Sequence, residues 1–133
     1  DLEDLLYRRS GLLGISGISS DMRTLLASDQ PEAREAIDYY CNSAARHAAS
    51  LVGAMGGLDA LVFTGGVGEH AAPIRSKILA HLAWLGLSSH DRDGRPNLHF
   101  DENCTDPGVF VIHADEEVVM ARHCLTICHS YIK

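Results

Sequence analysis

The residues of this sequence that could do chemistry are concentrated in Gly65–Glu69, where three glycines occur within four positions. Glycine readily adopts positive φ and, lacking a Cβ atom, lets another group approach the backbone closely. The apolar run Ala60–Phe63 precedes this stretch, and apolar residues recur at helical intervals from Ala71. A strand, a glycine turn and a helix start form an anion site, because the first helical amides are unpaired and the dipole is positive there. The sequence therefore predicts phosphate binding, with a purely structural tight turn as the alternative.

Glu116 and Glu117 follow a second apolar run, Val109–Ile112, after a short interval. Ligands of α/β proteins bind outside the carboxyl ends of the strands, and Mg²⁺ favours carboxylate and phosphate oxygens. This position predicts that Glu116 holds Mg²⁺, directly or through water. The alternative is a helix capped by Asp115 whose first turn carries solvated acids, which the helix dipole favours.

Asp21 and Arg23 lie at another predicted helix start, since Ser19–Asp21 supplies an N-cap for a short helix over Met22–Ala27. The acid can bind ribose hydroxyls or a base in a nucleotide pocket, and the planar guanidinium can stack or pair there. The other interpretation is a capping acid beside a surface base.

Two other kinds of site stay open at this level. Gly66–Ala71 satisfies the loose form G-x-G-x-x-A of a dinucleotide fingerprint, but the acids that follow, Asp91 and Asp93, lie in a polar stretch and do not end a strand. A non-catalytic module is the other alternative, either a nucleotide sensor or a zinc-stabilised interaction domain. Cys124 and Cys128 share a helix face and permit the zinc-stabilised form, although the usual C-x-x-C spacing is absent. The further zinc ligands would come from Cys104, His113, His123 and His129.

Helices must position these residues. The clearest helix start is Asp29–Glu32, which combines a cap, an early proline and a glutamate, and this helix ends at Gly56. Other helices are expected over Leu2–Arg9, from Ala71 to Gly86, and after Asp115. The expected apolar face of the long helix is Ala33, Ile37, Tyr40, Ala44, Ala48, Leu51 and Met55, and that of the last helix is Val118, Val119, Ala121, Leu125, Cys128 and Ile132.

The remaining segments complete the predicted fold. Gly11–Ile18 has a glycine at every third position, which disfavours both helix and strand and predicts a packed loop. Leu87–Asn103 is polar and predicts a surface excursion. The two apolar runs alternate with helices, so we expect an α/β fold with parallel strands that are buried on both faces.

The composition excludes several functional classes. The formal charge is −7 without a basic cluster, so a nucleic-acid partner is not expected. No run approaches the roughly 18 apolar residues of a membrane span, and the first residues lack a secretory pattern, so a membrane partner is not expected. The four cysteines are unevenly spaced, which argues against a disulfide scaffold and for a reduced, cytoplasmic protein.

Three stretches together resemble the acetate kinase family, which includes propionate and butyrate kinases. Ser10–Arg23 is similar to a family segment that ends in Ser-Asp-Phe/Met-Arg. Leu61–Arg75 is similar to the family's Phe-Thr-Gly-Gly-Ile-Gly-Glu-Asn signature, and Val111–Arg122 is similar to its closing Asn/Asp-Glu-Glu segment. The order and spacing of these stretches agree along the whole chain, which makes the resemblance specific.

The resemblance implies part of the C-terminal actin-like ATPase domain, a ribonuclease H-like α/β fold in which long helices pack a few central strands. It implies ATP-dependent phosphorylation of acetate or another short-chain carboxylate to an acyl phosphate, with ATP and Mg²⁺ as cofactors. Phosphoryl transfer needs chiefly positioning and charge neutralisation. Two helix starts and a metal-binding carboxylate can supply both.

Residue by residue, the resemblance implies that Asp21, Met22 and Arg23 contact the adenosine side of ATP and that Glu116 binds Mg²⁺. The adenosine and phosphate loop would consist of Gly66, Val67, Gly68, Glu69 and His70. His70 stands where the family usually has asparagine, so the family's side-chain amide is replaced by an imidazole.

Residues 1–133 would form the C-terminal nucleotide-binding portion, about the last third, of such a protein. The groups that bind the carboxylate and stabilise the transferring phosphoryl group lie in the earlier part of a family member. We therefore expect no catalytic residue in this chain and no kinase activity from the chain alone. The full-length protein is expected to be a homodimer.

Overall fold

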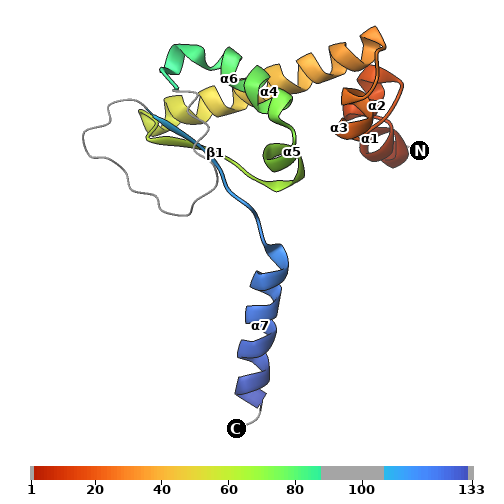
Figure 1. The fold of residues 1–133 in the computed structure, drawn as a ribbon. Helices are drawn as coiled ribbons and strands as arrows, with labels where there is room; N and C mark the ends of the chain where they lie inside the picture. The colour runs from red at the N-terminus through yellow and green to blue at the C-terminus, as the bar shows by residue number, and fades with distance from the viewer. Residues whose placement is uncertain (1, 88–106, 132–133) are drawn as a thin grey trace.

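A computed structural model of the chain describes residues 2–87 and 107–131. Helices form one body beside a two-stranded parallel sheet, and a last helix projects from the end of the second strand (Figure 1). The elements in chain order are α1 (Leu2–Arg8), α2 (Gly11–Ser16), α3 (Met22–Leu26), α4 (Pro31–Met55), β1 (Ala60–Phe63), α5 (Gly65–His70), α6 (Ala72–His81), the 3-10 turn η1 (Ala83–Leu85), β2 (Gly108–Val111) and α7 (Glu116–Tyr131). The excursion expected over Leu87–Asn103 lies almost wholly outside the described residues.

Helix α4 is the longest element, and its predicted start at Pro31 and end at Gly56 are confirmed, but the predicted side-chain cap is absent, because the N-cap is Gln30 and makes no capping hydrogen bond. Pro31 occupies the first turn, where its missing amide costs nothing. Gly56 ends the helix in the left-handed conformation, and its amide donates to the Val52 carbonyl. The predicted apolar face is only half right, because Leu51 is 63% exposed and Met55 is exposed as well. The buried residues of α4 instead lie in its first half: Ala33, Ala36, Ile37, Cys41 and Ala45.

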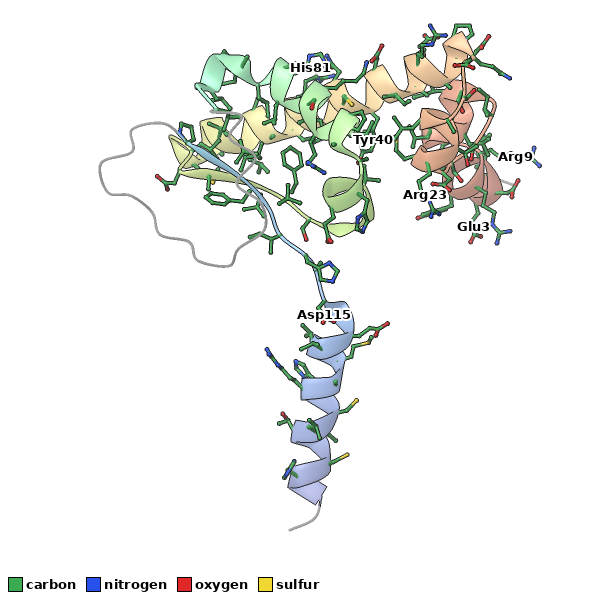
Figure 2. All side chains as sticks on the ribbon, viewed as in Figure 1. Glu3, Arg9, Arg23, Tyr40, His81 and Asp115 are labelled. Atoms are coloured by element: carbon green, nitrogen blue, oxygen red, sulfur yellow. The ribbon has the colours of Figure 1, made fainter. Side chains whose placement is uncertain are left out.

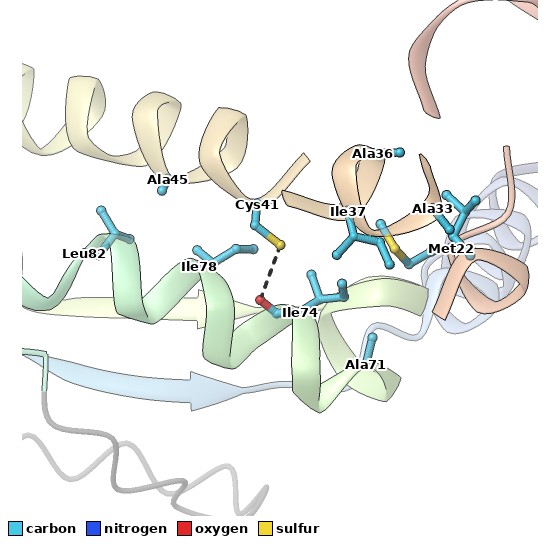
Figure 3. Packing of buried hydrophobic residues seen from close by; sticks show 11 residues of the cluster. Met22, Ala33, Ala36, Ile37, Cys41, Ala45, Ala71, Ile74, Ile78 and Leu82 are labelled. Carbon is cyan, nitrogen blue, oxygen red and sulfur yellow. Dashed lines mark hydrogen bonds between the residues drawn. The ribbon is translucent and has the colours of Figure 1, made fainter. Parts of the chain in front are cut away.

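The hydrophobic core lies between α4 and α6 (Figure 3). Ile74, Ile78 and Leu82 are buried against a face of α4 that is largely alanine. Small side chains on one helix let the backbones approach, so the larger residues of the other helix fill the space between them. The Cys41 thiol donates to the carbonyl oxygen of Ile74 at 3.9 Å, which ties the two helices together at the centre of this interface.

The prediction of a loop over Gly11–Ile18 is wrong, because residues Gly11–Ser16 form helix α2. The glycines do not prevent this helix, since Gly11 begins it and Gly17 ends it, both at positive φ. Only Gly14 lies inside, where the Arg9 carbonyl oxygen would be 2.8 Å from an added Cβ atom. The three glycines that were expected to prevent a helix therefore lie at its two ends and at one position of close packing.

Strands β1 and β2 pair in parallel, as expected, with Ala60 opposite Gly108 and Phe63 opposite Val111. The Ile112 amide continues the ladder by donating to the Phe63 carbonyl at 2.9 Å. The expectation of strands covered on both faces does not hold for the described part of the chain, where Val62 is exposed. Because the strands are parallel, their carboxyl ends lie at one edge of the sheet.

Helix α7 begins where predicted, and the Val118 amide donates to Asp115 Oδ1 at 3.0 Å, which confirms the cap. The helix projects away from the rest of the described chain (Figure 1), and its described side chains from residue 117 to residue 129 are all exposed. The apolar residues predicted to form its packed side therefore face solvent here. Within residues 2–87 and 107–131, no helix has the length and apolar character needed to span a bilayer.

Candidate functional site

The candidate site is the sheet edge at which β1 and β2 both end. Thr64 leaves β1 in an extended conformation and precedes α5, while residues 112–115 connect β2 to α7. The glycine turn predicted at Gly65–Glu69 is instead the start of a six-residue helix. The helix expected from Ala71 is α6, which begins at Ala72, and Ala71 separates it from α5. Strand, glycine segment and helix thus occur in the predicted order.

The three glycines of α5 meet different requirements. Gly65 has φ +72°, which disfavours any residue with a Cβ atom. Gly68 packs on the end of β1, where an added Cβ atom would be 3.3 Å from the Phe63 carbonyl carbon. Gly66 has neither constraint, because its φ is not positive and nothing lies within 4 Å of an added Cβ atom. The open space beside Gly66 is where a ligand can come close to the backbone.

Glu69 joins this glycine segment to the connection between β2 and α7. Its Oε1 accepts from the Gly65 amide at 2.8 Å and from the Ala114 amide at 2.9 Å. Its Oε2 lies 2.6 Å from His113 Nδ1. The Glu69 side chain is only 9% exposed, whereas that of His113 is 78% exposed. The Glu69 carboxylate therefore links the start of α5 to the segment between β2 and α7, across the sheet edge.

The same contacts set the charge of the site. The Ala114 amide, the His113 ring and the Gly65 amide together lower the pKa of Glu69 to about 2, from an ordinary value of 4.5. The hydrogen bond and charge of Glu69 raise the pKa of His113 above 6.5, and Asp115 adds to this effect. Hydrogen bonds to an ionised carboxylate stabilise its charged form. Glu69 is therefore an anion at neutral pH, and its neighbours favour a protonated His113.

Arg75, from α6, binds the other end of α5. Its Nη1 donates to the carbonyl oxygens of Gly68 at 3.0 Å and Glu69 at 2.9 Å. A cation at a helix C-terminus interacts favourably with the negative end of the dipole. Helix α5 is thus bound at its start by Glu69 and at its end by Arg75, which compensates for its three glycines.

Asp21 and Arg23 lie at the start of α3 and bind each other. Asp21 Oδ1 accepts from the Arg23 amide at 3.0 Å, and the two side chains form an ion pair at 3.2 Å. These hydrogen bonds lower the pKa of Asp21. The Arg23 side chain is 91% exposed, but Met22 is buried in the core. Figure 2 shows Arg23 on the side of α1–α3 and Asp115 at the start of α7.

The remaining residues predicted for the site differ in accessibility. The Val67 side chain is partly buried and packs against the hydrophobic core. His70 is exposed at the end of α5. Glu116 is the first residue of α7. The parallel pairing brings Glu69 beside the segment that leads to Glu116.

Sequence reasoning missed the part that His113 and Ala114 play at this edge. Both lie more than 40 positions from Glu69, and Ala114 contributes only its backbone amide. No local pattern marks such contacts, because they depend on the register of the parallel strands. The available signal was the prediction of parallel strands, because the carboxyl ends of paired parallel strands lie at one edge.

The alternatives gain no support from this geometry. Gly66–Ala71 forms most of a short helix that ends before α6, whereas a dinucleotide fingerprint opens one continuous crossover helix. Asp91 and Asp93 lie outside the described residues. Within residues 2–87 and 107–131, no group of three His, Cys, Asp or Glu side chains could hold a metal ion. Cys104 lies outside that part of the chain.

Comparison with known proteins places these observations in a family. The Acetokinase family matches residues 1–122. Acetate kinase from Rhodopseudomonas palustris is 51% identical over 127 residues, which cover 92% of this chain and 32% of the relative. Acetate kinase from Rickettsia akari is 42% identical over 123 residues, with the same two coverages. The chain thus spans 32% of the length of these relatives.

Solved structures agree with the sequence match. Acetate kinase from Entamoeba histolytica aligns with a TM-score of 0.72 and 29% identity, over 90% of this chain and 34% of that one. A propionate kinase from Francisella tularensis aligns with a TM-score of 0.58 and 42% identity, over 63% of this chain and 22% of that one. The predicted fold class, part of an α/β domain of the actin-like ATPase type, is confirmed. Because the family match covers 122 of the 133 residues, the chain belongs to the Acetokinase family.

Proposed function

We propose that this chain is the ATP- and Mg²⁺-binding portion of an enzyme that transfers the γ-phosphoryl group of ATP to acetate or another short-chain carboxylate. The products are an acyl phosphate and ADP. The observation that carries the proposal is the Acetokinase-family match, which includes α3, α5 and the start of α7. The relatives named acetate kinase and the solved propionate kinase support a carboxylate as acceptor.

In this proposal, ATP binds along the edge where β1 and β2 end. Gly66 has open space beside its backbone and Gly68 lets α5 pack closely on β1, so the backbone of Gly66–Gly68 is proposed to face the nucleotide. His70 is exposed and is proposed as a further contact. Asp21 and the exposed Arg23 are proposed for the adenosine side, and Met22 would contribute only its backbone because its side chain is buried.

Glu116 is proposed to hold Mg²⁺. The donor set suits this ion, which proteins commonly bind through one or two carboxylates together with substrate phosphates and water. Asp115 is already engaged as the cap of α7, whereas Glu116 is the first residue of that helix. When bound, Mg²⁺ would neutralise part of the charge on the phosphates, which an acidic protein needs.

Isothermal titration of the purified chain tests this assignment. We expect binding of Mg²⁺·ATP and none of NAD⁺ at the same concentration. Preference for NAD⁺ would instead support a dinucleotide-binding domain. Glu116→Ala should weaken Mg²⁺·ATP binding but not the binding of ATP in the presence of a chelator. Glu117→Ala, which removes the adjacent acid, is the matched control and should leave both affinities unchanged.

The activity itself is tested by trapping acyl phosphate as a hydroxamate. We expect the 133-residue chain alone to form no product from acetate and ATP, since the carboxylate-binding groups are proposed to lie elsewhere in a full-length protein. Acyl phosphate formed at a rate near that of a full-length acetate kinase would overturn this part of the proposal.

A further inference from the structure

Glu69 lies within the segment proposed to bind phosphate, yet its carboxylate binds the protein itself. Both oxygens are engaged, Oε1 by the amides of Gly65 and Ala114 and Oε2 by the His113 ring. A carboxylate directed at a phosphate would repel it. The observed contacts direct the Glu69 charge into the protein, and its side chain is only 9% exposed.

The two amides that Glu69 joins belong to different parts of the proposed site. Gly65 begins α5, next to the open backbone of Gly66. Ala114 lies two residues before Glu116, the first residue of α7. The strand pairing ends at the bond between Ile112 and Phe63, so Glu69 is the next link across this edge.

From this geometry we propose that Glu69 is a positioning residue, which fixes the glycine segment relative to the start of α7 and thereby sets how the phosphates and Mg²⁺ are held together. The inference rests on the proposed function and replaces the expectation that Glu69 itself contacts the nucleotide. The His113 ring contacts Glu69 Oε2 from the solvent side and, when protonated, balances its charge.

Three variants distinguish a positioning role of Glu69 from direct action of its charge on the ligand and from a purely structural role. Glu69→Gln keeps an oxygen that can accept from both amides but loses the charge facing His113, whereas Glu69→Ala loses every contact. His113→Ala removes only the ion pair. The matched control is Lys77→Met, which breaks the exposed ion pair between Lys77 and Asp38, on the α4–α6 side of the molecule.

Two measurements are made on each variant. Amide hydrogen exchange by NMR, without nucleotide, reports whether Gly65 and Ala114 are held. Titration calorimetry with Mg²⁺·ATP reports affinity separately from the fraction of competent protein, since a purely structural loss lowers the stoichiometry and leaves the Kd of the folded molecules unchanged.

We expect Glu69→Ala to abolish protection at Gly65 and Ala114 and to raise the Kd by about tenfold, the scale of a lost hydrogen bond to a charged group. Glu69→Gln should retain protection and raise the Kd by no more than about threefold, and Lys77→Met should change neither quantity. In His113→Ala, both amides should stay protected. Equal losses of affinity in Glu69→Gln and Glu69→Ala would overturn the proposal, because the charge itself would then act on the ligand.

Two further outcomes keep this inference distinct from the proposed function. If the unmodified chain binds Mg²⁺·ATP and Glu69→Ala binds it equally well despite losing amide protection, the positioning role is wrong and the proposed function stands. If the unmodified chain does not bind Mg²⁺·ATP, the proposed function fails and the positioning role fails with it, while the exchange data still report the link between Gly65 and Ala114.

Discussion

Adjacent glycines at the start of α5 illustrate how differently two identical residues can be constrained. Gly65 is held at positive φ, so its replacement strains the backbone wherever the side chain points. Gly66 has an ordinary φ and open space around it. Of these two positions the fold therefore requires glycine at the first, and for the second we propose close approach of the nucleotide as the reason.

Gly66→Ala should therefore separate stability from binding. Glycine inside a helix costs about 0.5–1 kcal/mol relative to alanine, so we expect this variant to be as stable as the unmodified chain or slightly more stable. Its affinity for Mg²⁺·ATP should nevertheless fall, because the added methyl group occupies the open space. Urea unfolding and calorimetry on the same sample provide the two measurements.

Gly65→Ala is the matched comparison. The left-handed conformation should cost it about 1–2 kcal/mol of stability, seen as a lower urea midpoint. If Gly66→Ala binds Mg²⁺·ATP as tightly as the unmodified chain, ligand approach is not the reason for glycine at position 66.

The pair formed by Glu69 and His113 predicts a stability that depends on pH. The raised pKa of His113 means that its contribution is complete below about pH 6.5 and is lost as the pH rises through the folded value. The lowered pKa of Glu69 means that its contribution is complete above about pH 4.5 and is lost as the pH falls towards 2.

We expect the stability difference between the unmodified chain and His113→Ala to be largest between these limits and to shrink at pH 8.5. Urea midpoints at pH 5.5 and 8.5 measure it, and a difference that grows with pH would contradict the assignment.

At the scale of elements, the interface between α4 and α6 should dominate stability. Ile74 is 1% exposed and packs against α4, so Ile74→Ala leaves a cavity and should cost about 2–5 kcal/mol. Denaturant unfolding measures the loss. Leu51→Ala, on the exposed end of α4, removes a comparable side chain and should stay within about 0.5 kcal/mol. Similar losses for the two variants would mean that this interface is not the core.

Local signals were sufficient to predict most elements but not what covers them. Pro31 and Gly56 determine the ends of α4 through their own backbone preferences, and Asp115 caps α7 through a contact within one turn. Leu51 shows the opposite case, since its helical spacing is correct but its side chain is largely exposed. The periodicity of a helix gives an apolar side and does not say which part of that side is buried.

The errors at glycines have a common physical cause. A glycine-rich stretch costs helix stability locally, but its surroundings can compensate: α2 packs against α4, and Arg75 of α6 binds the end of α5. The link from Glu69 to Ala114 likewise depends on strand register. That the two strands end at one edge was therefore predictable from the sequence, whereas the hydrogen bonds across that edge were not.

For the molecule as a whole, α7 presents an unusual surface. Met120, Leu125 and other apolar side chains are exposed along a helix that projects from the remainder of the described chain (Figure 1). Exposed apolar surface of this kind favours association. We expect the isolated chain to self-associate, with a mass by sedimentation equilibrium that rises with concentration.

Leu125→Glu should reduce this association, because it places a charge among the exposed apolar residues of α7. Thr126→Glu adds the same charge at the neighbouring position and should have a smaller effect. A monomer at all concentrations, or equal effects of the two variants, would show that this surface of α7 does not mediate self-association.

The parallel pairing of β1 with β2 also affects how the chain folds and opens. Ala60 can meet Gly108 only after the long intervening segment has closed into a loop, and this closure costs entropy before any ladder bond forms. The α4–α6 contacts also close a loop, with a separation of 33 residues between Cys41 and Ile74, so loop closure alone does not distinguish the two regions. Burial does distinguish them, because Val109 is the one buried residue of the two strands, whereas the α4–α6 interface forms the core. The sheet edge should therefore open before the core, and a nucleotide bound there, as proposed, would slow this local opening before it affected global unfolding.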